Sequence, residues 1–111
     1  MSQKDRVRYM RLVLFFDLPV KTAKQRKDYR VFRKFLLKDG FLQLQESVYS
    51  KLVINDALAN SSVNRVRKNR PPEGLVQVLK VTENQYSTMD YIVGSRAEYE
   101  EIDTTEELLV L

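Results

Sequence analysis

The 111-residue chain contains no cysteine and no histidine, and only three glycines. Without thiol or imidazole groups, it cannot form a Ser-His or Cys-His nucleophile pair, a zinc finger or an imidazole acid–base site. Its glycines lie too far apart for a glycine-rich phosphate-binding loop. Any chemistry must therefore use carboxylates, hydroxyls, Lys, Arg or a hard metal ion held by oxygen ligands.

Long apolar runs are also missing from the chain. The longest one without a charge, Leu12 to Phe16, is far too short to span a bilayer, and residues 1–10 lack the apolar core of a secretory signal. We expect no membrane association and a cytoplasmic location, which the absence of cysteine fits. A chain of this length forms one domain with a modest core, so dimerisation is a reasonable expectation.

Charge is distributed unevenly along the chain. Residues 1–94 carry a net charge of +9, whereas residues 95–111 carry −5. A basic body suggests a polyanionic partner, most often nucleic acid. We expect a domain over residues 1–94 and an acidic C-terminal tail over residues 95–111. The tail either covers the basic face of its own chain or docks on a partner or dimer mate through Leu108, Leu109 and Val110.

The hydrophobic pattern predicts the order strand, helix, strand, strand, helix, strand. The first strand, which has no polar side over residues 12–16, is expected to be buried on both faces. The two middle strands are expected to connect near Ser50. Thr82 to Gln85 has capping-box spacing, and Met89 to Val93 favours a further strand over a helix. The six predicted elements span residues 8–17, 22–39, 42–49, 51–54, 56–70 and 75–81.

This order is typical of the ferredoxin-like α+β fold, βαββαβ, in which two helices cover one face of an antiparallel sheet. We expect an extra C-terminal strand at Leu108 to Leu111. Because the other face of the sheet would be bare, the pattern also predicts a homodimer through sheet packing. The strand at residues 75–81 lacks the aromatic residues that an RNA-recognition sheet uses for base stacking.

The helix expected at residues 22–39 is unusually basic. Helical spacing arranges its cations in two neighbouring stripes, and only one acid, Asp28, lies among them. Ordinary solvated helices mix acids with bases, so this pattern favours phosphate binding over a plain surface. The cluster from Arg65 to Arg70 is either a second phosphate contact or a favourable C-terminal charge. The candidate nucleic-acid ligands are Arg26, Lys27, Arg30, Arg33 and Lys34.

Asp17 is the candidate catalytic and metal-binding residue, because it ends an otherwise apolar strand. The alternative is a structural side chain that accepts backbone N–H groups in the following turn. One carboxylate cannot hold Mg²⁺ tightly, but two from symmetric subunits could share one ion with waters and a phosphate oxygen.

Four stretches of the chain resemble one family over almost its full length. They are FFDLP with Asp17, TAKQRKDYRVFRKFLLKDGF, QESVYS with Ser47 and Tyr49, and VTENQYSTMDYIVG. The chain resembles the small CRISPR-associated endoribonucleases that partner the Cas-one integrase in spacer acquisition, in the form that accompanies type II systems. The resemblance implies a ferredoxin-like homodimer with Asp17 facing its mate and binding Mg²⁺ in nuclease-active members. It also implies supporting roles for Ser47 and Tyr49.

Two functions follow from this resemblance. In the first, the homodimer is a scaffold that bridges integrase dimers and binds double-stranded prespacer DNA for integration into the CRISPR array. In the second, it is a Mg²⁺-dependent endonuclease for RNA or DNA that uses the paired Asp17 residues. Some nuclease-active relatives carry an arginine near the start of the second strand, where this chain has Gln43.

Overall fold

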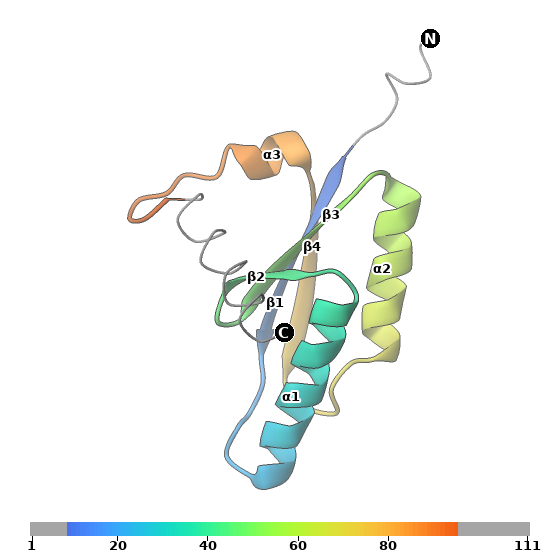
Figure 1. The fold of residues 1–111 in the computed structure, drawn as a ribbon, viewed down its shortest axis with the longest axis vertical. Coiled ribbons are helices and arrows are strands. Elements are labelled where there is room, and N and C mark those ends of the chain that lie inside the picture. The colour runs from blue at the N-terminus through green and yellow to red at the C-terminus, as the bar shows by residue number, and fades with distance from the viewer. Residues whose placement is uncertain (1–8, 96–111) are drawn as a thin grey trace.

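Residues 9–95 are described by the computed structural model, and they form a four-stranded antiparallel sheet with two long helices on one face (Figure 1). Neighbouring strands follow the order β2-β3-β1-β4, so β2 and β4 form the edges of the sheet. This arrangement confirms the predicted ferredoxin-like α+β fold. The elements are β1 (Met10–Asp17), α1 (Ala23–Lys38), β2 (Leu42–Gln45), β3 (Val48–Val53), α2 (Asp56–Lys68), β4 (Leu75–Thr82) and α3 (Glu83–Ser87).

Each helix begins at a side chain that satisfies free backbone N–H groups. Thr22 and Gln25 form a capping box at the start of α1. Thr82 and Gln85 form another at the start of α3, and the sequence predicts this second box. Asn55 caps α2 by accepting a hydrogen bond of 2.8 Å from the backbone N–H of Leu58. These local signals explain why the helix starts are readable from the sequence.

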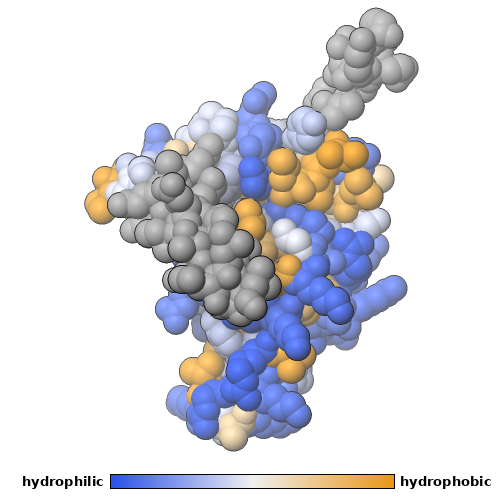
Figure 2. Space-filling model, viewed as in Figure 1, coloured by the Kyte–Doolittle hydropathy of each residue, from blue (hydrophilic) through white to orange (hydrophobic). Residues whose placement is uncertain are grey.

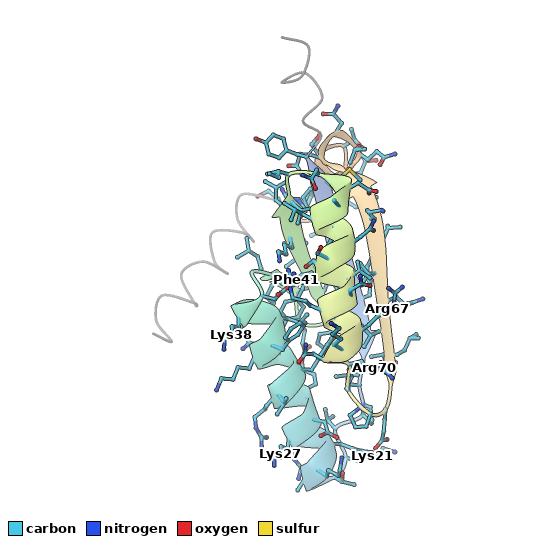
Figure 3. All side chains as sticks on the ribbon, turned by 90° about the vertical axis from the view of Figure 1, so that its right-hand side faces the viewer. Lys21, Lys27, Lys38, Phe41, Arg67 and Arg70 are labelled. Atoms are coloured by element: carbon cyan, nitrogen blue, oxygen red, sulfur yellow. The ribbon has the colours of Figure 1, made fainter. Side chains whose placement is uncertain are left out.

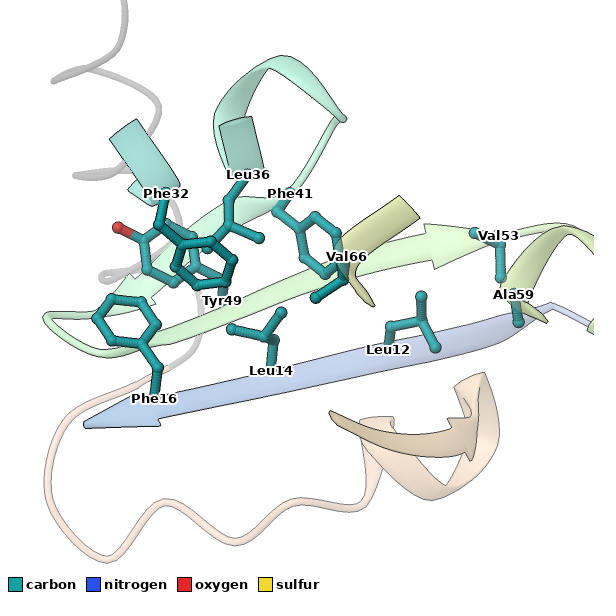
Figure 4. Packing of buried hydrophobic residues seen from close by; sticks show 10 residues of the cluster. All are labelled: Leu12, Leu14, Phe16, Phe32, Leu36, Phe41, Tyr49, Val53, Ala59 and Val66. Atoms are coloured by element: carbon teal, nitrogen blue, oxygen red, sulfur yellow. The ribbon is translucent and has the colours of Figure 1, made fainter. Parts of the chain in front are cut away.

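The core lies between the sheet and the two long helices (Figure 4). Leu12, Leu14 and Phe16 point from β1 toward the helices and are almost completely buried. The ring of Phe16 packs edge-on against Phe32 of α1, at 5.6 Å between centroids, and stacks on Tyr49 of β3 at 5.7 Å. These contacts fix the end of β1 against both α1 and β3.

The second face of the sheet is only partly covered. Side chains alternate along a strand, so Val13, Phe15 and Asp17 point away from the long helices. Val13 is buried, but Phe15 is 38% exposed, so the expectation of a strand buried on both faces is wrong at its end. The short helix α3 covers one end of this open face, held by paired hydrogen bonds of 2.9 Å from Arg11 to Glu83.

Two predicted boundaries differ from the structure. The chain reverses at Glu46 and Ser47, whereas Ser50 lies inside β3, opposite Val13. The whole of β3 pairs with β1, and this continuous pairing outweighs the local break in apolar residues near Ser50. The second helix ends at Lys68, two residues before the predicted end.

Met89 to Val93 forms neither the expected strand nor a helix. Ile92 and Val93 are 90% and 87% exposed, so their β propensity has no neighbouring strand to satisfy it within residues 9–95. The predicted acidic tail and the strand at residues 108–111 lie outside the described residues, as do Leu108, Leu109 and Val110. No helix in the described range is long and apolar enough to cross a membrane.

Candidate carboxylate site and nucleic-acid interface

Asp17 is exposed at the last position of β1, on the open face of the sheet. It lies opposite Leu75 of β4, and the alternation of β1 places it on the same side as Phe15. Its carboxylate has no hydrogen bond or ion pair with any residue from 9 to 95. This geometry gives no support to the interpretation of Asp17 as a turn-capping side chain and leaves its oxygen atoms free for a ligand.

The backbone beside Asp17 is closely packed on two sides. Gly74 has φ +96°, and a Cβ there would lie 2.7 Å from the carbonyl oxygen of Asp17 and 2.7 Å from Cδ2 of Leu18. Only glycine adopts this conformation readily and leaves room for the approach. On the other side, the backbone N–H of Phe16 donates to the carbonyl oxygen of Ser47 at 3.1 Å. The position of Asp17 is therefore set by neighbouring backbone.

Ser47 and Tyr49 both contact Phe16, the residue before Asp17. Ser47 does so through its backbone carbonyl, and Tyr49 through its ring, which lies on the helix-covered side of the sheet. Tyr49 is fully buried and is thus separated by the sheet from the carboxylate of Asp17. The structure places Tyr49 where it can support the strand end without touching a ligand of Asp17, and it places Ser47 beside that strand end.

Mg²⁺ prefers oxygen ligands such as carboxylates, and it usually keeps several waters. An exposed, unpaired carboxylate at Asp17 suits such an ion. No group of three potential metal ligands occurs in the described part of the chain. One copy therefore offers only part of a coordination shell, and a second copy would have to supply another carboxylate.

The five candidate nucleic-acid ligands on α1 divide into two groups. Arg26 donates to the carbonyl oxygens of Val20 and Lys21 at 3.1 and 2.9 Å, and Arg33 donates to Oε1 of Gln43 at 2.8 Å. These two guanidinium groups tie α1 to the preceding loop and to β2.

Lys27, Arg30 and Lys34 form the second group. All three are exposed, and none has an acidic partner or a side-chain hydrogen bond among residues 9–95. The surface along α1 is largely hydrophilic (Figure 2). These three cations are therefore free to contact phosphate groups.

The end of α2 adds further cations. Arg65 is bound to Asp39 at 2.6 Å, but Arg67 and Arg70 have no carboxylate partner in the described range. Figure 3 shows Lys27 and Lys38 on α1, Arg67 on α2 and Arg70 just after α2, all on the helix side of the molecule. Among the described residues, the helix layer thus carries cations without a carboxylate partner on α1 and at the end of α2.

A polar cluster that the sequence analysis did not predict surrounds Asp39, which follows the last residue of α1. Its carboxylate accepts hydrogen bonds from Arg65 of α2, from Lys51 of β3 at 3.1 Å and from Ser62 of α2 at 3.0 Å. Burial by itself would raise the pKa of Asp39, but these three donors outweigh it and lower that pKa. A lysine inside β3 was the one available signal, because a cation on the covered face needs a partner.

The fold and these sites define a ferredoxin-like α+β protein with an exposed carboxylate on the open sheet face and exposed cations on the helix layer, none of which has an oppositely charged partner among residues 9–95. The family "CRISPR associated protein Cas2" matches residues 10–89. The chain belongs to this family.

Three relatives, all named CRISPR-associated endoribonuclease Cas2, illustrate the similarity. The protein from Treponema denticola is 54% identical over 103 residues, which cover 92% of this chain and 100% of the relative. The protein from Streptococcus mutans serotype c is 47% identical over 78% of this chain and 80% of its own length. The protein from Ligilactobacillus salivarius is 42% identical over 78% and 86% of the two chains.

Proposed function

We propose that the protein is a homodimeric scaffold for CRISPR spacer acquisition in the cytoplasm, which bridges dimers of the Cas-one integrase and binds double-stranded prespacer DNA. The observation that carries this proposal is a group of exposed cations on α1, Lys27, Arg30 and Lys34, that have no partner among residues 9–95. Unpaired cations on a helix surface suit contacts to the phosphate backbone, which give affinity without reading base sequence. A protein that accepts prespacers of many sequences requires this kind of contact.

The open sheet face supports the homodimer. Phe15, Leu75 and Leu79 are 38%, 54% and 52% exposed on this face, and a contiguous apolar surface is typical of an interaction site. Two copies that pack through their open faces would bury these side chains and leave both helix layers outside. Each dimer would then present two basic α1 helices to a duplex.

Asp17 favours a second function, a Mg²⁺-dependent endonuclease. Its free carboxylate lies on the face through which two copies would pack, and the relatives described above are named endoribonucleases. If two Asp17 residues hold Mg²⁺, the ion would supply charge stabilisation at a phosphate and a water of lowered pKa. In this function, the carboxylate of Asp17 would bind and orient the ion, and Gly74 would keep the end of β1 in place.

The two functions are separated by nucleic-acid binding and cleavage assays on the same variants. The scaffold predicts that Asp17→Ala binds duplex DNA as the wild type does, whereas Lys27→Glu/Arg30→Glu/Lys34→Glu loses binding. The endonuclease predicts Mg²⁺-dependent cleavage by the wild type that disappears in Asp17→Ala. Full duplex binding by the charge-reversed variant would refute the proposed DNA surface.

A further inference from the structure

Arg33 differs from the neighbouring cations of α1 in its exposure. It is half-buried, whereas Lys27, Arg30 and Lys34 are exposed. These three residues have helical spacing along one side of the helix, and we call them the α1 cation row. Arg33 lies three residues after Arg30, a spacing that makes two residues neighbours on a helix surface. A guanidinium group turned outward at Arg33 would therefore add a fourth cation to this row.

Arg33 binds a neutral amide, that of Gln43 on β2. Gln43 is paired with Tyr49, whose buried side chain lies on the helix side of the sheet, so Gln43 faces α1 as well. Its Oε1 accepts a hydrogen bond of 2.8 Å from Nη2 of Arg33, and its Nε2 donates to the carbonyl oxygen of Glu46 at 3.4 Å. Both ends of the amide are thus engaged, and the acceptor end is held toward Arg33.

The carboxylate of Glu46, in the turn between β2 and β3, does not take the place of this amide. Burial raises the pKa of Tyr29, the charge of Glu46 raises it further, and the charge of Arg33 lowers it, so both charges act on the same phenol. Even so, no ion pair joins Arg33 to Glu46 in the structure of residues 9–95. Glu46 is exposed, and ion pairs with exposed carboxylates contribute little. Among the described side chains, Gln43 is therefore the hydrogen-bond partner of Arg33.

We propose that Gln43 is a positioning residue, which keeps the guanidinium of Arg33 on β2 and out of the α1 cation row. This role rests on the proposed function, in which the row contacts DNA phosphates. The side chain at position 43 then sets how many cations each α1 offers to a duplex, three with glutamine and four without an acceptor. Because phosphate contacts add affinity at any base sequence, Gln43 limits how tightly the helix holds DNA.

NMR of the arginine side chains tests the position of Arg33 without DNA. Gln43→Met keeps the length of the side chain but removes the oxygen acceptor, whereas Gln43→Glu keeps an acceptor. In the isotope-labelled wild type, the hydrogen-bonded Arg33 should give separate Nη signals, which are identified by their loss in Arg33→Gln. These signals should merge in Gln43→Met, because the guanidinium then rotates freely, and stay separate in Gln43→Glu. Merged signals in the wild type, or separate signals in Gln43→Met, would overturn the proposal.

Salt titrations of duplex binding test the consequence for DNA. In Gln43→Met, the slope of log affinity against log salt concentration should become steeper by about 0.9 for each copy whose α1 contacts the duplex. Between about 50 and 200 mM salt, this is an additional loss of affinity of about 3.5-fold per contacting helix. Gln43→Met/Arg33→Gln should return to the wild-type slope, and Gln43→Glu should keep it.

The outcomes separate this role of Gln43 from the proposed function itself. An unchanged slope in Gln43→Met, or a steeper slope that persists in Gln43→Met/Arg33→Gln, would overturn the proposal. Duplex binding by the wild type without salt dependence would instead refute the proposed function. The NMR signals of Arg33 would then still decide whether Gln43 holds its guanidinium on β2.

Discussion

The division of the α1 cations into free and paired groups predicts how DNA binding depends on salt. Each phosphate contact by a cation contributes about 0.9 to the slope of log affinity against log salt concentration. Replacement of Lys27, Arg30 and Lys34 with glutamine removes three α1 cations that have no partner among residues 9–95. The slope should therefore become less steep by about 2.7 for each copy whose α1 contacts the duplex.

This change in slope corresponds to a large effect on affinity. Between about 50 and 200 mM salt, the wild type should lose about 40-fold more affinity than the variant, per contacting helix. Fluorescence anisotropy of a labelled duplex, titrated at several salt concentrations, measures both slopes. Circular dichroism checks that the variant is folded.

The chain offers a control variant with the same change in net charge. Lys24, Arg26 and Arg33 already bind Asp28, backbone carbonyls and Gln43, respectively. Their replacement with glutamine should leave the slope nearly unchanged, because none of the three is free to contact phosphate. Equal slopes for the two triple variants would refute the reasoning, since net charge alone would then explain binding.

Three further predictions concern stability and assembly. Asp39→Asn should lower the free energy of unfolding in urea by about 2–3 kcal/mol at neutral pH, because it weakens charge-assisted hydrogen bonds. Since the fold lowers the pKa of Asp39, the ionised form stabilises the fold above the ordinary pKa of 3.8, and this stabilisation should shrink as the pH falls through the lowered pKa. A difference in unfolding free energy between the wild type and Asp39→Asn that grows in acid would contradict this. Gly74→Ala should cost more than about 1 kcal/mol, and more than Gly40→Ala, whose added Cβ would meet only the flexible end of Lys51 at 3.4 Å; equal unfolding midpoints would refute the close approach to Asp17. Phe15→Asp should give a folded monomer in size-exclusion chromatography with light scattering, and a monomeric wild type would contradict the proposed dimer.

The fold was predictable because its signals are local. Apolar periodicity and the caps at Thr22, Asn55 and Thr82 identify the helices, and their order along the chain defines the ferredoxin-like topology. The errors occur where the structure depends on pairing between strands that are distant in the sequence. Pairing of β3 with β1 carries the strand through Ser50, and Val93 has no strand beside it in the described range.

The residue types of the candidate site were predictable from the sequence, but the hydrogen-bond and ion-pair partners of these residues were not. Helical spacing identified a basic α1, but it did not show that Arg26 and Arg33 bind within their own chain while Lys27 and Arg30 have no partner in the described part of it. Those contacts depend on a loop and a strand that meet α1 only in the folded protein. The cluster around Asp39 was missed for the same reason, since its members come from three elements.

A spacer-integration assay tests the proposed scaffold most directly. Purified Cas-one integrase, a double-stranded prespacer and a CRISPR repeat array are combined with the wild type, with Asp17→Ala or with Lys27→Glu/Arg30→Glu/Lys34→Glu. The scaffold predicts that Asp17→Ala supports integration at the wild-type level and that the charge-reversed variant supports none. Loss of integration in Asp17→Ala together with normal integration by the charge-reversed variant would contradict it.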